Sequence, residues 1–302
     1  MCGIVGLFAK SADIEESLGE HLAAMLSQMS DRGPDSAGVA VYREPAPTGS
    51  SKLTLFSADP LYDWDALCTD LAKAFGGAPE ASVRASHAVV VVDAEASDAE
   101  SWVRATHPEL RVMSAGRAIE IYKETGRPEE FVRQFALGDF RGTHALGHTR
   151  MATESRVTTE GSHPFSTGLD LCLVHNGSLS NHNRLRERLR REGITFQTDN
   201  DTEVAAGYLA WRLRAGASLE EALEGCLDDL DGFYTFLVGT VDGFAVLRDS
   251  IACKPAVLAE TDEWVAMASE WRAIAVLPGA AEAHAWEPAP AVVYAWERAK
   301  VA

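Results

Sequence analysis

Cysteines are few in this sequence of 302 residues, and basic residues are outnumbered by acidic ones. The five cysteines are odd in number, widely spaced and free of any Cys-x-x-Cys pair. They indicate a reducing compartment and argue against a disulfide framework or a zinc site. Lys and Arg total 27 against 45 Asp and Glu, which gives a formal net charge of −18. Because a field of that sign repels phosphate backbones and anionic membrane surfaces, we expect neither nucleic acid nor a membrane as a partner.

Long apolar runs and an amino-terminal leader are also lacking. The longest apolar stretches, such as 88–92, fall far short of the roughly 20 residues that a membrane helix needs. The first residues are apolar only as far as Ala9 and show no basic lead or cleavage-type site. The expected localisation is therefore cytoplasmic. A composition of 46% hydrophobic and 24% charged residues is typical of a soluble globular protein.

Strand patterns dominate both ends of the chain, and helical patterns lie between them. Residues 3–8 predict a buried strand, followed by a helix over 14–29. Helices are predicted near 183–192, 202–214 and 219–230, and 232–294 is a run of strands separated by turns. Alternating helices and strands over about 45–140 predict an α/β elaboration embedded in a single domain, 1–302. Such an order fits stacked sheets covered by helices.

Cys2 is the first candidate for chemistry. If Met1 is removed, as is expected when the second side chain is small, a thiol and a free α-amine share one residue. Unperturbed pKa values of about 8.5 for a thiol and about 7.7 to 8.0 for an α-amine let the amine activate the sulfur as a base. The alternative is a cysteine that only packs against the first strand.

Two segments offer cations for substrate binding. Residues 31–38 (DRGPDSAG) specify an abrupt backbone path beside Arg32. Residues 147–153 (GHTRMAT) end a predicted strand, where the planar fork of Arg150 could hold a carboxylate and Thr153 could add a hydroxyl. A surface or strand-end ion pair is the alternative for each arginine. His163 is either a satisfied loop histidine or a substrate ligand.

The segment 174–181 (VHNGSLSN) predicts an oxyanion site. Asn-Gly ordinarily marks a hairpin turn, but here the chain continues into a helix instead of a second alternating strand. The Asn176 amide and the Gly177 N–H would form two convergent donors for the tetrahedral oxyanion that thiolate attack on a carbonyl produces.

Asp201 opens a predicted helix within 198–204 (TDNDTEV). It is either a first-turn acid favoured by the helix dipole or the holder of a substrate ammonium. The pairs Asn200 with Glu203 and Ser97 with Glu100 have the spacing of a capping box, which predicts how their helices begin.

These candidates together meet one chemical requirement. A site that binds an α-amino acid by both ends and cleaves its side-chain amide needs a cation, an anion, a nucleophile, a base and two oxyanion donors. The sequence supplies Arg150, Asp201, Cys2 with its own amine, Asn176 and Gly177.

On these motifs the sequence resembles the class II glutamine amidotransferase domain, an N-terminal-nucleophile hydrolase. The matching segments are MCGIVG at the start, RGPDSAG at 32–38, GHTRMAT at 147–153, HNG at 175–177 and DTEV at 201–204. The resemblance implies an α+β fold, a four-layer αββα sandwich with an α/β insertion. The sequence departs from the family at Met151, where an aromatic residue is common, and at Ala252 and Cys253, where a glycine is usual.

The resemblance also implies roles for individual residues. Cys2 would attack the amide of L-glutamine to give a glutamyl thioester and ammonia, with no cofactor or metal in this chain. The remaining roles would be carboxylate binding by Arg150 and Thr153, ammonium binding by Asp201, an oxyanion hole from Asn176 and Gly177, and ordering or lining of the pocket by His163 and Arg32.

No acceptor domain is recognisable, so we expect the ammonia to reach another polypeptide or to be released. Segments such as MCGIVGLF and DLDGFYTF are similar to the stand-alone glutaminase subunit of glutamate-synthase-like enzymes, N-methylglutamate synthase among them. There a separate flavin-containing synthase subunit would receive the ammonia. Two alternatives stay open: a partner-independent N-terminal-nucleophile amidohydrolase, and a non-catalytic subunit that reports nitrogen status.

Overall fold

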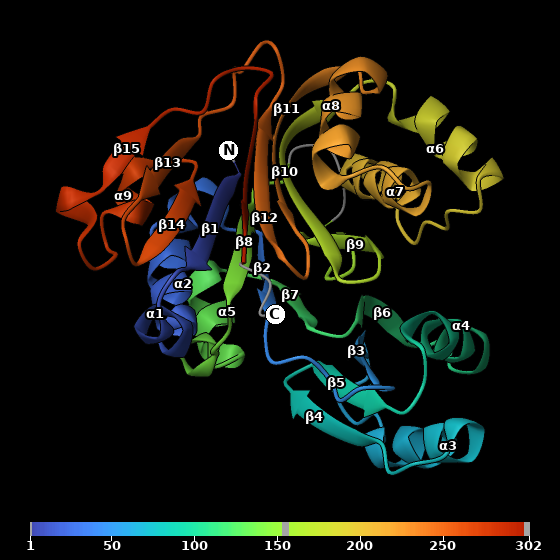
Figure 1. Cartoon of the computed structure of the whole chain (residues 1–302). Coiled ribbons are helices and arrows are strands. Elements are labelled where there is room, and N and C mark those ends of the chain that lie inside the picture. Colours follow the sequence, from blue (N-terminus) through green and yellow to red (C-terminus); the bar gives the residue numbers. More distant parts are fainter. Residues whose placement is uncertain (1, 153–156, 299–302) are drawn as a thin grey trace.

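Two antiparallel sheets face each other in the computed structural model, which describes residues 2–152 and 157–298 (Figure 1). In spatial order the seven-stranded sheet contains β15 (His284–Trp286), β13 (Val257–Glu260), β14 (Trp264–Ala268), β1 (Gly3–Ala9), β8 (His144–Arg150), β2 (Ser36–Tyr42) and β7 (Ile119–Thr125). The five-stranded sheet contains β16 (Val293–Glu297), β12 (Gly243–Arg248), β11 (Gly232–Gly239), β10 (Leu171–Leu179) and β9 (Phe165–Gly168). Apolar side chains from both sheets, such as Ile4, Leu146, Val174 and Leu237, form the core between them.

Helices cover the outer face of each sheet (Figure 1). The seven-stranded sheet carries α1 (Ala12–Glu16), α2 (Leu18–Ser27), α5 (Pro128–Gln134) and α9 (Trp271–Ile274), with the short 3-10 helices η1 (Ser30–Arg32), η2 (Leu137–Asp139) and η3 (Ala280–Glu282). The five-stranded sheet carries α6 (His182–Arg191), α7 (Asp201–Arg214) and α8 (Leu219–Asp229). The four-layer αββα sandwich expected from the sequence is confirmed.

A third sheet forms a smaller lobe below the sandwich in Figure 1. It contains β4 (Glu80–Arg84), β5 (His87–Val92), β3 (Ser51–Phe56) and β6 (Arg111–Gly116), together with α3 (Trp64–Phe75) and α4 (Ala96–Thr106). Leu53, Leu67, Val90 and Val103 belong to a core of its own. The segment 45–140 also contains β7 and α5, which belong to the layers of the sandwich.

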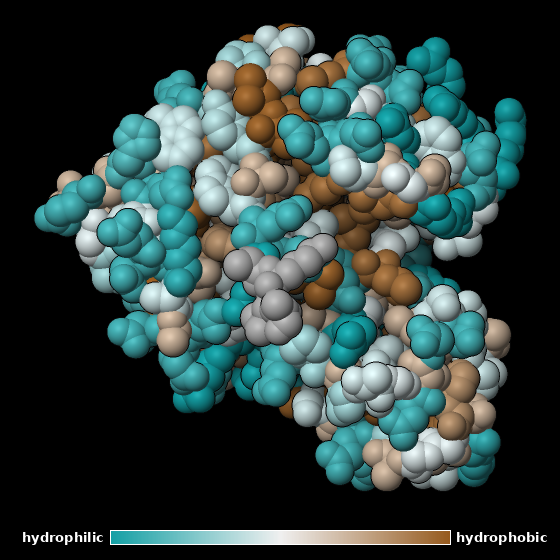
Figure 2. Space-filling view, viewed as in Figure 1, coloured by the Kyte–Doolittle hydropathy of each residue, from teal (hydrophilic) through white to brown (hydrophobic). Residues whose placement is uncertain are grey.

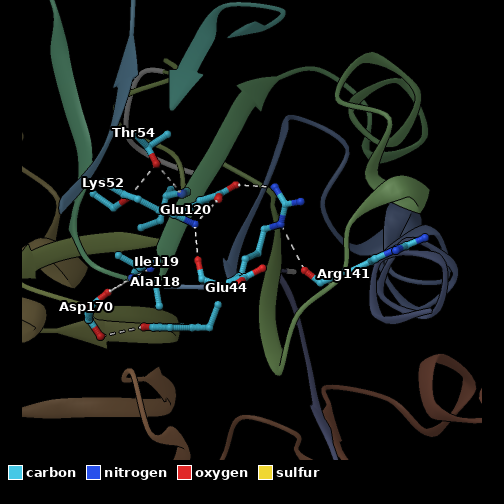
Figure 3. Close-up of polar contacts among 12 residues, drawn as sticks. Glu44, Lys52, Thr54, Ala118, Ile119, Glu120, Arg141 and Asp170 are labelled. Carbon is cyan, nitrogen blue, oxygen red and sulfur yellow. Dashed lines mark hydrogen bonds and ion pairs between the residues drawn. The ribbon is translucent and has the colours of Figure 1, made fainter. Parts of the chain in front are cut away.

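Asp170 ties the return of the chain from this lobe to the five-stranded sheet. Its carboxylate accepts the backbone N–H groups of Arg117 (2.7 Å), Ala118 (2.8 Å) and Ile119 (3.0 Å), at the turn between β6 and β7 (Figure 3). Asp170 itself lies in the turn between β9 and β10. Three charge-assisted hydrogen bonds therefore fix the base of the lobe to the sandwich.

The helix predicted over 14–29 is divided at Ser17 into α1 and α2. The Ser17 hydroxyl donates to the Asp13 carbonyl (2.6 Å), a local bond that competes with regular helix. The N–H of Gly19 donates to the Phe140 carbonyl (2.8 Å), and a Cβ on Gly19 would lie 2.1 Å from the Leu137 carbonyl oxygen. The break therefore lets the chain pack closely against η2.

Neither predicted capping box forms. Helix α4 begins after Glu95, so Ser97 lies inside its first turn and is not the N-cap. At α7, Asn200 is the N-cap and its side chain accepts the N–H of Thr202. Glu203 does not bond back to Asn200, because its buried carboxylate accepts the N–H groups of Gln197 (2.7 Å) and Thr198 (2.8 Å). The spacing of Asn200 and Glu203 therefore predicted where α7 begins, but not which hydrogen bonds cap the helix.

The face of the molecule shown in Figure 2 is hydrophilic over most of its outer surface, and hydrophobic residues gather in the upper body, toward the middle. Within the described residues, no helix is both long enough and apolar enough to cross a membrane.

Candidate active site

Cys2 precedes β1, a strand in the middle of the seven-stranded sheet. Gly3 of β1 is opposite Thr149 of β8, and Val5 is opposite Ala268 of β14. Paired on both sides, β1 has little freedom to shift. The amino-terminal end of the chain is therefore held at one edge of the sandwich core.

Hydrogen bonds from two elements hold the backbone of Cys2. Its carbonyl oxygen accepts from Arg32 Nε (2.9 Å) and from Asn176 Nδ2 (3.3 Å). Its Sγ lies 3.8 Å from the carbonyl oxygen of Met151, which follows β8. The cysteine is half-buried. Two of the predicted site residues thus donate to the backbone of the predicted nucleophile.

The chain packs tightly against β8 directly after Arg32. A Cβ on Gly33 would lie 2.3 Å from the carbonyl carbon of Thr149, so only glycine fits there. The buried Arg32 guanidinium also pairs with Glu270, next to the end of β14. The hydrogen bond from Arg32 holds the pKa of Glu270 below its usual value. Arg32 therefore connects Cys2 to β14.

Asn176 and Gly177 lie in β10, on the opposite sheet, and not in a hairpin turn. The buried Asn176 amide donates to the Cys2 carbonyl and to Ser269 Oγ (3.1 Å). An oxyanion contact from this side chain requires one of these two bonds to be exchanged. Gly177 has φ +146°, and a Cβ there would lie 1.9 Å from the Phe233 carbonyl oxygen. Glycine is therefore required at this position.

Three buried histidines adjoin Asn176, and Thr202 joins two of them. The Thr202 hydroxyl lies 2.7 Å from His163 Nε2 and 3.0 Å from His175 Nδ1. The His148 ring stacks on His163, and its Nε2 lies 3.3 Å from Asn176 Oδ1. Burial lowers the pKa of His148 to about 3, lowers the pKa of His163 well below its usual value, and lowers that of His175. All three are therefore neutral near pH 7.

Of these residues, the sequence singled out only His163. His148 and His175 lie within the GHT and HNG motifs, and Thr202 follows Asp201. The signal that could have found them is that the predicted strand before Arg150, the HNG motif and the start of the helix at Asp201 were all assigned to the same candidate site. His148, two positions before Arg150, and His175, next to Asn176, could therefore have been assigned to this site as well.

Asp201 is the first residue of α7, and Arg150 is the last residue of β8. Asp201 Oδ2 accepts the N–H of Leu179 (2.9 Å), and its side chain is 23% exposed. The Arg150 guanidinium is buried and donates to the Gly161 carbonyl (3.3 Å), which also accepts from Asn200 Nδ2 (3.4 Å). The loop at Gly161 therefore links Arg150 to the start of α7.

The predicted Thr153 lies outside the described residues. Of the other predicted site residues, contacts link Cys2 with Arg32 and Asn176, and the histidine cluster extends this network to His163 and, at 3.8 Å from His175 Nδ1, to Asp201. Among the described residues, no group of three or more His, Cys, Asp or Glu side chains is placed to hold a metal ion.

Two facing sheets between helical layers, with a cysteine leading into the central strand, are the architecture of the N-terminal-nucleophile hydrolases. The family described as "Glutamine amidotransferase domain" matches residues 148–276. The "Glutamine amidotransferase-like protein GlxB" of Rhizobium meliloti is 55% identical over 303 residues, covering 100% of both chains. This chain belongs to the class II glutamine amidotransferase family, whose members hydrolyse the side-chain amide of glutamine.

More distant relatives match parts of their own chains. The glutamine–fructose-6-phosphate aminotransferase of Vibrio vulnificus is 35% identical over 116 residues, which are 38% of this chain and 19% of that protein. The glutamine phosphoribosylpyrophosphate amidotransferase of B. subtilis, solved with ADP and GMP, superposes with a TM-score of 0.61 at 20% identity. That superposition covers 98% of this chain and 49% of the other, and it supports the fold.

Proposed function

We propose that this protein is a glutaminase component that hydrolyses the glutamine side-chain amide through a thioester on Cys2 and delivers ammonia to a separate synthase subunit. The observation that supports the proposal most directly is that Arg32 and Asn176 both donate hydrogen bonds to the Cys2 carbonyl. Those two bonds orient the backbone of the residue that bears both the thiol and, after loss of Met1, the amine.

In the proposed reaction the Cys2 amine takes the proton of the thiol, and the thiolate attacks the side-chain carbonyl carbon of glutamine. Asn176 and the Gly177 N–H stabilise the negative oxygen of the tetrahedral intermediate. When the C–N bond breaks, the protonated amine donates to the departing nitrogen, which leaves as ammonia. Water, deprotonated by the same amine, then attacks the thioester and releases glutamate.

Glutamine is proposed to bind by both of its charged ends. Arg150 and Thr153 would hold the carboxylate, Asp201 would hold the ammonium, and His163 and Arg32 would shape the pocket. Two features support this assignment. The first is that the Arg150 side chain is buried. The second is that, within the described residues, Asp201 Oδ2 accepts only a backbone N–H, that of Leu179, and that burial lowers the pKa of the neighbouring His175. The negative charge of Asp201 is therefore available to a cation.

The test of the chemistry is a pair of cysteine variants. Cys2→Ala should abolish glutamine hydrolysis with an unchanged circular dichroism spectrum, whereas the control variant Cys253→Ala, at an exposed cysteine, should keep it. Sequencing of active protein should begin at Cys2, and glutamine lacking its α-carboxylate should be a poor substrate. Full activity in a chain that retains Met1 would contradict the mechanism.

Exposed apolar side chains near the site support docking of a second subunit. Met151 and Phe233, 45% and 36% exposed, adjoin Cys2 and Gly177 respectively, and Trp271, 40% exposed, follows Glu270. Ile251, 66% exposed, lies in the loop after β12. Burial of such residues is a usual source of binding free energy between subunits. The resemblance to the glutaminase subunit of N-methylglutamate synthase makes a flavin-containing synthase the proposed partner.

Co-expression with a flavin-containing synthase tests the docking proposal. The tagged chain should retain a subunit with flavin absorbance, and ammonia should reach its acceptor without mixing with ammonium in solution. Ile251→Asp should weaken retention, and Leu61→Asp, at an 88% exposed position in the small lobe, should not. Glutamine hydrolysis that proceeds equally well without any partner would favour an independent amidohydrolase. No turnover even with the synthase bound would favour a nitrogen sensor.

A further inference from the structure

A cavity of about 820 Å³ lies between the small lobe and the sandwich. Its walls come from α1, the end of β2, the strands β3 to β5, the start of β7 and the segment before β8. None of the predicted site residues lines it. Its volume is within the range of small-molecule sites, roughly 300 to 1,000 Å³, and junctions between structural units are a usual place for them.

The cavity differs in charge from the rest of the chain. The chain has a net charge of −18, but five cations and four carboxylates line the cavity. The cations are Arg43, Lys52, Arg84, Arg141 and Arg298, and the carboxylates are Glu15, Glu16, Glu44 and Glu120. A local excess of positive charge in an acidic protein favours an anionic ligand at this position.

Two of these cations share one carboxylate on the inner wall. Glu120, 3% exposed, accepts from Arg43 Nη1 (3.0 Å), Lys52 Nζ (3.0 Å) and the Tyr122 hydroxyl (3.0 Å). Figure 3 shows Lys52 directed toward Glu120 and also toward the backbone carbonyl of Glu44, at 2.7 Å. One buried carboxylate cannot neutralise two cations, so one positive charge is left over.

Arg84 is the third cation of the inner wall. Its Nη1 donates to the Phe135 carbonyl (3.0 Å), and its guanidinium lies 4.6 Å from the centre of the Phe140 ring. The Arg43 guanidinium lies 5.4 Å from the same ring. No carboxylate of the described part of the chain is within ion-pair distance of Arg84. Because the aromatic ring and the carbonyl hold the fork in place, little side-chain entropy is left to lose when an anion binds.

Two ion pairs lie at the edge of the cavity, and Glu44 is the fourth carboxylate of the lining. Arg141 bonds Glu16 (3.0 Å) and Arg298 bonds Glu15 (2.9 Å), and all four side chains are at least one-third exposed. With those two pairs set aside, three cations (Arg43, Lys52 and Arg84) face two carboxylates (Glu44 and Glu120), so the cavity keeps a net charge of +1. Val89 and Val91 supply an apolar patch on the lobe side.

We propose that this cavity is a second ligand site, which binds a small organic anion by its carboxylate or phosphate group through Arg84 and the Arg43–Lys52 pair. The ligand would contact both the lobe and the sandwich. This gives the small lobe a binding role that is separate from glutamine hydrolysis.

Isothermal titration of the full chain with inorganic phosphate and with succinate tests the site and distinguishes the two anionic groups. One probe should bind, and Arg84→Ala should weaken its Kd about tenfold or more, as expected for loss of a charged hydrogen-bond donor. Ser82→Asp adds a carboxylate at an exposed position in the wall and should weaken binding with no loss of packing. Arg104→Ala, a half-buried arginine in α4, is the control and should leave Kd unchanged.

Three results would overturn the proposal. One is that neither probe binds at millimolar concentration. Another is that binding persists unchanged in both Arg84→Ala and Ser82→Asp. The third is that glutamine displaces the probe, which would assign the binding to the site at Cys2. Glutaminase activity of both variants without probe should equal that of the unmodified chain, so failure of this inference is distinguishable from failure of the proposed function.

Discussion

Replacing Gly177 by alanine should lower the kcat for glutamine hydrolysis about a hundredfold by moving the backbone of β10. The added Cβ would lie 1.9 Å from the Phe233 carbonyl oxygen, and contacts below 3.0 Å are essentially never adopted. Because the obstructing atom is backbone of β11, no side chain can rotate away, so the two strands must separate by more than about 1 Å. Such a displacement at the proposed oxyanion donor should cost about a hundredfold in kcat. The backbone conformation at φ +146° adds about 1 to 3 kcal/mol of strain.

Gly193→Ala is the matched control. Gly193 also has a positive φ, +81°, but its Cβ would meet nothing within 4 Å, and it lies at the end of α6. This variant should lose about 1 kcal/mol of stability and keep its kcat. The assay is ammonia release from glutamine, together with thermal unfolding of both variants. A Gly177→Ala chain with kcat within twofold of the unmodified chain would refute the reasoning.

Three further predictions follow from other contacts. Arg32→Lys keeps a charge for Glu270 but loses the planar fork that also reaches Cys2, so kcat/KM should fall about 10- to 100-fold with little change in Tm; equal activity would contradict this. Asp170→Ala leaves three backbone N–H groups without their acceptor and should lower the free energy of unfolding in urea by about 2 to 4 kcal/mol. Burial lowers the pKa of His87 to about 3. Because the unfolded chain binds a proton at this histidine below about pH 6.5 and the folded chain does not, the free energy of unfolding falls by up to about 1.4 kcal/mol per pH unit between pH 6.5 and 3. His87→Leu should flatten this acid loss in urea titrations at pH 7 and pH 5, and an unchanged slope would exclude His87 as its source.

The order of strand and helix patterns was enough to predict the layers of the fold. Apolar runs such as 3–8 are buried on both faces, and only a sandwich with helices outside gives every such run a partner. The break at Ser17 was not predictable, because it depends on Gly19 meeting η2, more than 110 residues later in the chain. Local periodicity carries no information about such a contact.

Prediction of the site was likewise limited to residues within recognisable motifs. Residue chemistry grouped Cys2 with Asn176, and the resemblance to the family added Arg32; the structure has both side chains donating to the Cys2 carbonyl. Ser269 and Glu270 were missed as partners because their roles arise only where β14 pairs with β1. The cavity beside Arg84 was also missed, since its charges come from segments that no motif connects.

The pairing of β1 with β14 brings two distant parts of the sequence together beside Cys2. The N–H of Ile4 donates to Ser269 Oγ (2.9 Å), a partner 265 positions away, and Glu270 beside it steadies Arg32. A chain cut back before β14 would therefore lose both the acceptor of the Ile4 N–H and the carboxylate that pairs with Arg32, the donor to the Cys2 carbonyl.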